Sequence, residues 1–108
     1  MIPSFKIEET SRFFENILGF STIMETLTYR IYHKDNLTIH ILQAGKEIGQ
    51  MEFYLEVDNV DLLWSEIKDK LIGLRVKAPF NQAYGMREIH IGIPETNTLL
   101  FIGAVQKN

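Results

Sequence analysis

Two side chains on predicted strands, an imidazole and a carboxylate, could carry metal-binding or ligand-binding chemistry. His40 interrupts an apolar, strand-like run, and Glu52 lies in an alternating stretch at 51–57. Both side chains are ligands for divalent cations. In the alternating stretch, Glu52, Tyr54 and Glu56 share one side, because successive strand side chains point to opposite faces. Carboxylates and aromatic rings on one face can attract a cation and stack on a planar group.

The composition narrows the chemistry further. The 108 residues include no cysteine, which excludes disulfides, thiolate metal sites and cysteine nucleophiles, and is typical of a reducing compartment. The net charge is −3 and no lysine or arginine cluster is present, so nucleic acid is not an expected partner. No apolar run approaches the ~18 residues of a membrane span, and no targeting signal is evident. We expect a cytoplasmic domain that handles a small molecule or a protein.

The periodicity of polar and apolar residues predicts two similar halves, about 1–44 and 50–105, within one domain that spans 1–108. Thr10 and Asn59 are the expected N-caps of two helices, which Gly19 and Gly73 end. A polar linker at 44–49 joins the halves, and a loop is predicted at 78–85. The predicted strands are 2–7, 20–25, 28–33 and 37–42, then 51–57, 74–77, 86–93 and 98–104. Each half is therefore βαβββ, an internal repeat of the α+β class.

Three stretches fall in register with these halves. They are Arg12–Phe20 (RFFENILGF), Glu56–Asp61 (EVDNVD), and Tyr84–Ile89 (YGMREI) followed by Ile93–Asn97 (IPETN). Together they resemble the vicinal-oxygen-chelate superfamily, which includes glyoxalase I, extradiol dioxygenases, and fosfomycin- and bleomycin-resistance proteins. The resemblance covers nearly the whole chain. It implies two βαβββ modules that form an eight-stranded mixed cup, in a homodimer whose clefts use modules of both chains.

The third stretch departs from the family motif in two ways. Ile93 and Thr96 replace the aspartate and glycine of its turn, although Pro94 still fixes φ for an expected type I turn. Tyr84 stands where the motif has a tryptophan that stacks on the ligand.

The resemblance also gives a test for a metal cofactor. Enzymes of the superfamily hold a divalent ion with His, Glu or Gln at four positions, on the first and last strand of each module. The residues aligned with these positions are Ile2 (or its neighbours Pro3 and Ser4), His40, Glu52 and Leu100. Two of the four are aliphatic, and one imidazole with one carboxylate rarely holds a hard ion against water. We expect no cofactor, with a divalent ion on His40 and Glu52 as the alternative.

The histidines have structural alternatives. Alternation turns Ile39 and Ile41 toward the helix, so His40 faces the interior of the implied cup, either as a ligand contact or as a hydrogen-bonded strand residue. His33 is most simply a turn residue, and no motif supports His90.

A metal-free cup implies binding rather than catalysis. The resemblance is strongest to the bleomycin-resistance-like branch, which implies sequestration of a small, antibiotic-like molecule that is cationic and aromatic. The expected ligand-binding residues are Tyr84, Glu52, Tyr54, His40, Phe80 and Glu56. Trp64 and the Phe13–Phe14 pair are expected in the core instead. The alternatives are a metal-dependent lyase, dioxygenase or thiol transferase, and a protein-interaction role with a filled cup.

Overall fold

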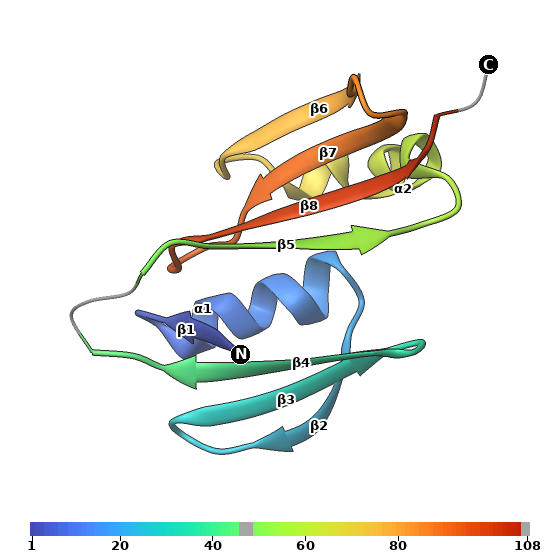
Figure 1. Cartoon of the computed structure of the whole chain (residues 1–108). Coiled ribbons are helices and arrows are strands. Elements are labelled where there is room, and N and C mark those ends of the chain that lie inside the picture. The colour runs from blue at the N-terminus through green and yellow to red at the C-terminus, as the bar shows by residue number, and fades with distance from the viewer. Residues whose placement is uncertain (46–48, 107–108) are drawn as a thin grey trace. The chain divides into compact units, whose positions relative to one another are not determined.

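The computed structural model describes residues 1–45 and 49–106, and it divides into two units (Figure 1). The first unit is Met1–Gln50 together with Ile93–Asn97, and the second is Met51–Gly92 together with Thr98–Asn108. Part of the predicted linker, residues 46–48, lies outside the described residues. Within the described ranges, no helix has the length and apolar character needed to cross a membrane.

The first unit contains one mixed sheet and one helix. Its elements are β1 (Ile2–Ser4), α1 (Ile7–Arg12), the π-helical segment η1 (Phe13–Ile17), β2 (Ser21–Glu25), β3 (Tyr29–Lys34) and β4 (Leu37–Gln43). The strand order is β1-β4-β3-β2, with β1 parallel to β4 and the other pairs antiparallel.

The second unit repeats this plan. Its elements are β5 (Met51–Glu56), α2 (Val60–Ile67), the 3-10 segment η2 (Lys68–Lys70), β6 (Val76–Asn81), β7 (Met86–Gly92) and β8 (Thr98–Val105). The strand order β5-β8-β7-β6 matches that of the first sheet, again with one parallel pair, β5 with β8. The predicted α+β class with two βαβββ modules is therefore confirmed.

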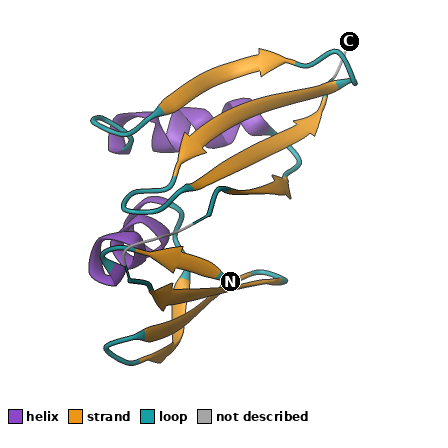
Figure 2. Ribbon diagram, turned by 60° about the vertical axis from the view of Figure 1, so that its left-hand side comes forward, coloured by secondary structure: helices purple, strands orange, loops and turns teal. Residues whose placement is uncertain are grey.

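In each unit the helix covers one face of the sheet, and we call the opposite face the open face (Figure 2). The helix-covered faces hold the apolar core. Ile39 and Ile41 on β4 are buried there, which places His40 on the open face as alternation predicts. Leu100 on β8 is fully buried on the helix side of the second sheet.

The start of the first helix differs from the prediction. The helix begins at Ile7, and Thr10 lies inside it as a buried residue rather than as its N-cap. The Gln43 side chain replaces a local cap, because its Oε1 accepts from the Ile7 N–H at 2.9 Å and its Nε2 donates to the Phe5 carbonyl at 2.8 Å. A residue 36 positions away thus satisfies the helix terminus. The second cap is as predicted, with Asn59 Oδ1 accepting from the Leu62 N–H at 3.0 Å.

Two further predictions, a strand boundary and a turn type, are corrected. β6 runs over Val76–Asn81, so Phe80 lies on a strand and not in the predicted loop. β6 is an edge strand, where Pro79 is tolerated because no ladder hydrogen bond from its nitrogen is needed. Glu95 has φ +59°, and this positive value excludes the expected type I turn after Pro94. A type II turn requires a positive φ at this position.

Candidate functional site

The open face of the second sheet carries most of the predicted site. Tyr54 and its neighbours Glu52 and Glu56 on β5 are exposed on this face, as alternation predicts. The sheet register adds the residues paired with them across the next two strands. These are Leu99, Phe101 and Gly103 on β8, and Gly92, His90 and Glu88 on β7. The result is one surface of carboxylates and rings built by three adjacent strands.

Glu88 is the most unusual group on this face, because its carboxylate is completely buried. Tyr84 donates its hydroxyl to Oε2, while Gln82 Nε2 and His90 Nε2 lie 3.1 and 2.9 Å from Oε1. Burial raises the pKa of Glu88, but the hydrogen bonds, led by that of Tyr84, outweigh burial and lower the pKa to about 2. Glu88 is therefore ionised at neutral pH, and His90 donates to it.

Tyr54 reaches this carboxylate because residue 103 is a glycine. A β-carbon at Gly103 would overlap the Tyr54 hydroxyl and would lie 2.8 Å from Tyr54 Cζ and 3.0 Å from Glu88 Cγ. The tyrosine ring thus crosses β8 over the space that a side chain would fill. Burial and then the Glu88 carboxylate raise the pKa of the Tyr54 hydroxyl, which keeps it a neutral donor.

An aromatic cluster adjoins the carboxylate. The His90 ring stacks on Phe101 with centroids 4.0 Å apart and an interplanar angle of 22°, and it meets Phe80 edge to face at 4.9 Å. Lys77 Nζ lies 3.9 Å from the centre of the Phe80 ring. These rings give a planar ligand a surface on which to stack.

The structure brings three of the predicted ligand-binding residues into one neighbourhood. Tyr54 and Tyr84 both interact with Glu88. Phe80 contacts the ring of His90, which is hydrogen-bonded to Glu88. Glu52 and Glu56 lie on the same face of β5. The predicted set thus occupies one surface of the second unit, apart from His40.

Sequence reasoning missed the centre of this surface. Glu88 belongs to the third family-like stretch but was not among the expected ligand-binding residues, and His90 had no motif support. The alternation of β7 was the available signal, since it places both residues on the face opposite Ile89 and Ile91.

His40 lies in the first unit and has a local partner. Its Nδ1 is 2.6 Å from the Tyr29 hydroxyl, with which it shares a hydrogen bond, and the two rings meet edge to face at 5.7 Å. Tyr29 stands on the adjacent strand β3. The structure thus shows His40 as a hydrogen-bonded strand residue, which was one of the two interpretations of this histidine.

The four positions that the family resemblance assigns to metal ligands do not provide a suitable donor set. Ile2 and Leu100 both point to the helix-covered faces. The residues beside them on the open faces, Pro3 and Leu99, carry no ligating side-chain atom. The hydroxyl of Ser4, the other aligned alternative, is fully buried and shares a hydrogen bond of 2.6 Å with Thr10. Among residues 1–45 and 49–106, no three His, Asp or Glu side chains are grouped so that they could hold a metal ion. At the aligned positions, His40 and Glu52 therefore supply two ligands, whereas a catalytic divalent ion needs three or four N or O ligands.

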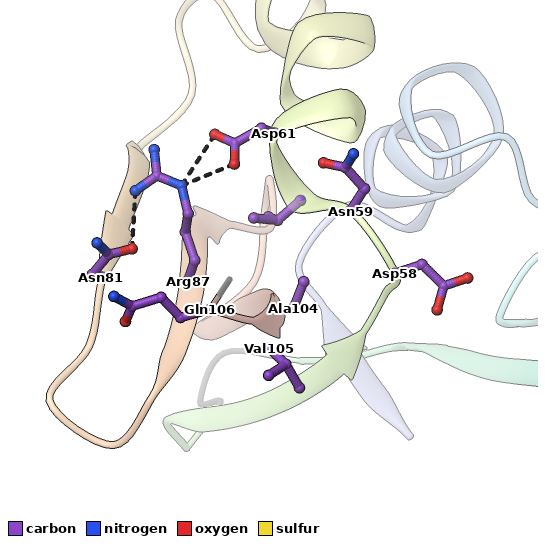
Figure 3. Close-up of a pocket in the computed structure, with 9 residues that line it drawn as sticks. Asp58, Asn59, Asp61, Asn81, Arg87, Ala104, Val105 and Gln106 are labelled. Atoms are coloured by element: carbon purple, nitrogen blue, oxygen red, sulfur yellow. Dashed lines mark hydrogen bonds and ion pairs between the residues drawn. The ribbon is translucent and has the colours of Figure 1, made fainter. Parts of the chain in front are cut away.

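A separate pocket of about 440 Å³ lies at the start of α2 (Figure 3). Two of its three charged groups are bonded to each other, because Arg87 Nε donates to both oxygens of Asp61 at 2.9 and 3.1 Å. Arg87 Nη1 also donates to Asn81 at 3.1 Å. None of the predicted site residues lines this pocket. The open face offers aromatic surface and a buried ionised carboxylate, so we assign the candidate site there.

The sequence has no match among family models or curated proteins. Solved structures do match. The bleomycin resistance determinant encoded on transposon Tn5 aligns with a TM-score of 0.80 at 20% identity, covering 98% of this chain and 94% of that one. The bleomycin-binding protein of Streptomyces verticillus, complexed with copper(II)-bleomycin, aligns at 0.79 and 14% identity, covering 99% and 92%. Lactoylglutathione lyase from Agrobacterium tumefaciens aligns at 0.78 and 12% identity, covering 95% and 88%.

These similarities confirm the expected fold. The three proteins cover nearly the full length of this chain, and both modules align. The low identities mean that the fold alone is shared, and binding proteins and a lyase are built on it. Function therefore has to be inferred from the site.

Proposed function

Because the chain has the vicinal-oxygen-chelate fold, we propose that it binds and sequesters a small, antibiotic-like molecule without altering it chemically. The observation that carries the proposal is the open face of the second sheet, where the ionised, buried Glu88 lies beside a cluster of aromatic rings. The proposal places the protein in the cytoplasm, in keeping with a sequence that lacks cysteine.

The expected ligand is a planar molecule with a cationic group. Glu52 and Glu56 provide exposed carboxylates along β5, and Glu88 adds a negative charge that persists at neutral pH. Such charges raise the local concentration of a cation. The rings of Tyr84 and Phe101 supply flat surface for stacking, and Tyr84 is 64% exposed.

The site supports binding better than metal-dependent catalysis. Catalysis on this fold by a divalent ion requires three or four N or O ligands and one open position. At the aligned positions, the imidazole of His40 and the carboxylate of Glu52 supply two such ligands, fewer than this number.

The alternative, a metal-dependent lyase, dioxygenase or thiol transferase, retains support from the lyase among the structural neighbours. Elemental analysis of the purified protein distinguishes the two proposals. A stoichiometric divalent metal that disappears in His40→Ala would favour the enzyme and overturn the binding proposal.

Calorimetric titration with bleomycin, with and without copper(II), tests the binding proposal. We expect saturable binding that weakens about ten-fold in Tyr84→Ala and about two- to five-fold in Glu52→Gln. Glu66→Gln removes one exposed charge from α2, away from the open face, and should leave the affinity unchanged. Absence of binding, or equal affinity in all four proteins, would contradict the proposal.

We further propose that the active unit is a homodimer. Each module has only about half of the 108 residues, a size at which a single core is marginal, so association would bury additional apolar surface. Light scattering after gel filtration should give twice the chain mass of 12.6 kDa. A mass of one chain at micromolar concentration would contradict this part of the proposal.

A further inference from the structure

A shallow hollow at the β6 side of the open face differs in charge from the rest of that face. It measures about 180 Å³ and lies wholly within the second unit. We call it the basic hollow. The residues that line it are Arg75, Val76, Lys77, His90, Gly92 and Leu99. The lining includes two cationic side chains and no carboxylate.

Gly92 allows the arginine to line the hollow. The Gly92 N–H donates to the Arg75 carbonyl at 2.7 Å, which holds the two backbones together. A β-carbon at Gly92 would lie 3.1 Å from Arg75 Nε and 3.3 Å from its Nη2. The guanidinium therefore lies across the glycine, on the same face as His90.

The two cations of the basic hollow have no acidic partner within ion-pair distance. Among the residues that the structure describes, neither Arg75 nor Lys77 has a carboxylate oxygen within 4.0 Å. Lys77 instead lies over the Phe80 ring. Two unpaired cations beside one hollow favour an anion.

The sheet register separates this basic end from the acidic end of the same face. Leu99 lines the hollow, and Gly103, which is paired with Glu56 and Glu88, lies four residues farther along β8. At about 3.3 Å per residue, Leu99 and Gly103 are about 13 Å apart. His90, which also lines the hollow, spans part of this distance, because its Nε2 lies 2.9 Å from Glu88 Oε1 and its ring stacks on Phe101.

Glu52 stands at the side of the hollow that is farthest from the strand of Lys77. It is paired with Leu99, but it stands on β5, three strands away from β6 in the order β5-β8-β7-β6. At about 4.8 Å per strand this separates it from the strand of Lys77 by about 14 Å.

We propose that the basic hollow is a subsite for an anionic group on the ligand, whose planar ring stacks beside it on His90 and Phe101. The ligand class is thereby narrowed to an elongated zwitterion, with its cation toward Glu56 and Glu88 and its carboxylate, sulfonate or phosphate toward Arg75 and Lys77. This inference rests on the proposed function, since it assigns a second part of the same ligand surface.

The test uses 2-naphthoate and its neutral twin 2-naphthamide, with binding followed by amide chemical shifts in NMR. We expect 2-naphthoate to bind about five- to ten-fold more tightly than the amide and to shift Gly92 and His90. Arg75→Gln and Lys77→Gln should each reduce this preference, while Lys70→Gln, an equal charge change on η2, should retain it. Added salt should weaken the binding of 2-naphthoate and leave that of the neutral amide unchanged.

Two further ligands, 2-naphthyl phosphate and naphthalene-2-sulfonate, identify the kind of anion. Whichever of the carboxylate, phosphate and sulfonate binds most tightly is the anionic group that the subsite prefers. Equal affinity for naphthoate and naphthamide at the His90–Phe101 rings would overturn the anionic subsite and leave the stacking surface intact. Failure of every naphthalene compound to bind, while bleomycin still binds, would likewise overturn the subsite but not the proposed function. Loss of bleomycin binding is a failure of the proposed function itself.

Discussion

Replacing Gly103 with alanine tests the close contact on which the site depends. The added methyl group would overlap the Tyr54 hydroxyl and would lie 2.8 Å from Tyr54 Cζ. Tyr54 is 39% exposed, so its ring can turn away toward solvent more easily than the backbone of β8 can move. The expected outcome is an outward Tyr54 and a Glu88 carboxylate with one donor fewer.

The magnitude follows from these two effects. An extra methyl group in a packed region destabilises a protein by about 1–3 kcal/mol. Loss of one hydrogen bond to a charged group contributes about 1.5–3 kcal/mol when the group stays buried, and less when water reaches it. Because the Tyr54 ring moves outward and water follows, we expect the lower end of this range, about 2 kcal/mol in total.

Urea unfolding measured through Trp64 provides the assay. Trp64 is the single tryptophan and lies on α2, so it reports on the unit that contains Gly103. Gly49→Ala is the matched control, because a β-carbon at Gly49 meets no atom within 4 Å. In a Tyr54→Phe background the hydroxyl overlap is gone, and the effect of Gly103→Ala should shrink by about 1 kcal/mol.

An equal loss of stability in both backgrounds would refute this explanation, because the tyrosine hydroxyl would then not be the atom that the methyl group displaces. Unchanged stability in the Tyr54-containing protein would refute it as well. The control variant should differ from the parent by no more than about 0.5 kcal/mol.

Three further predictions concern pH, helix anchoring and a surface ion pair. Hydrogen bonds outweigh burial and lower the pKa of Glu88 from 4.5 to about 2. Glu88 therefore stabilises the fold fully above pH 4.5, and this contribution is lost as the pH falls toward 2. The contribution is about 3 kcal/mol, and urea unfolding across this pH range should show it in the parent but not in Glu88→Gln. Gln43→Ala removes the acceptor of the Ile7 N–H at the start of α1 and should lower the free energy of unfolding by about 1–2 kcal/mol, measured by circular dichroism. Asp61→Asn weakens the exposed pair with Arg87 and should cost less than about 1 kcal/mol in the urea assay.

The first two of these predictions have matched controls, and the third has an outcome that would contradict it. Glu66→Gln should keep the acid-dependent loss of stability, and an identical loss in Glu88→Gln would show that another carboxylate causes it. Gln50→Ala alters an exposed glutamine and should leave α1 unaffected. A loss above 2 kcal/mol in Asp61→Asn would show that the pair with Arg87 is more than a surface contact.

Local patterns predicted most of the fold, because most of it is decided locally. The period of two placed Ile39 and Ile41 on the helix side of β4, and Asn59 caps α2 through its own side chain. Thr10 failed as a cap because Gln43, far away in sequence, satisfies the first turn of α1. A tertiary hydrogen bond of this kind leaves no local signal.

The candidate site likewise has a part that follows from local sequence and a part that depends on tertiary contacts. Alternation within a single strand was enough to predict that Glu52, Tyr54 and Glu56 share one face of β5. The burial of Glu88 requires Tyr54 from β5 and Tyr84 from the turn before β7, together with the missing side chain of Gly103. Strand order and register decide that combination, and neither is encoded in any single segment.

NMR chemical-shift mapping of the full chain during titration with bleomycin tests most directly where the ligand binds. We predict saturable shifts at Tyr54, Tyr84, Glu88, His90 and Phe101, on the open face of the second sheet. Shifts concentrated instead at the α2 pocket around Asp61 and Arg87, with the open face unchanged, would contradict the proposed site.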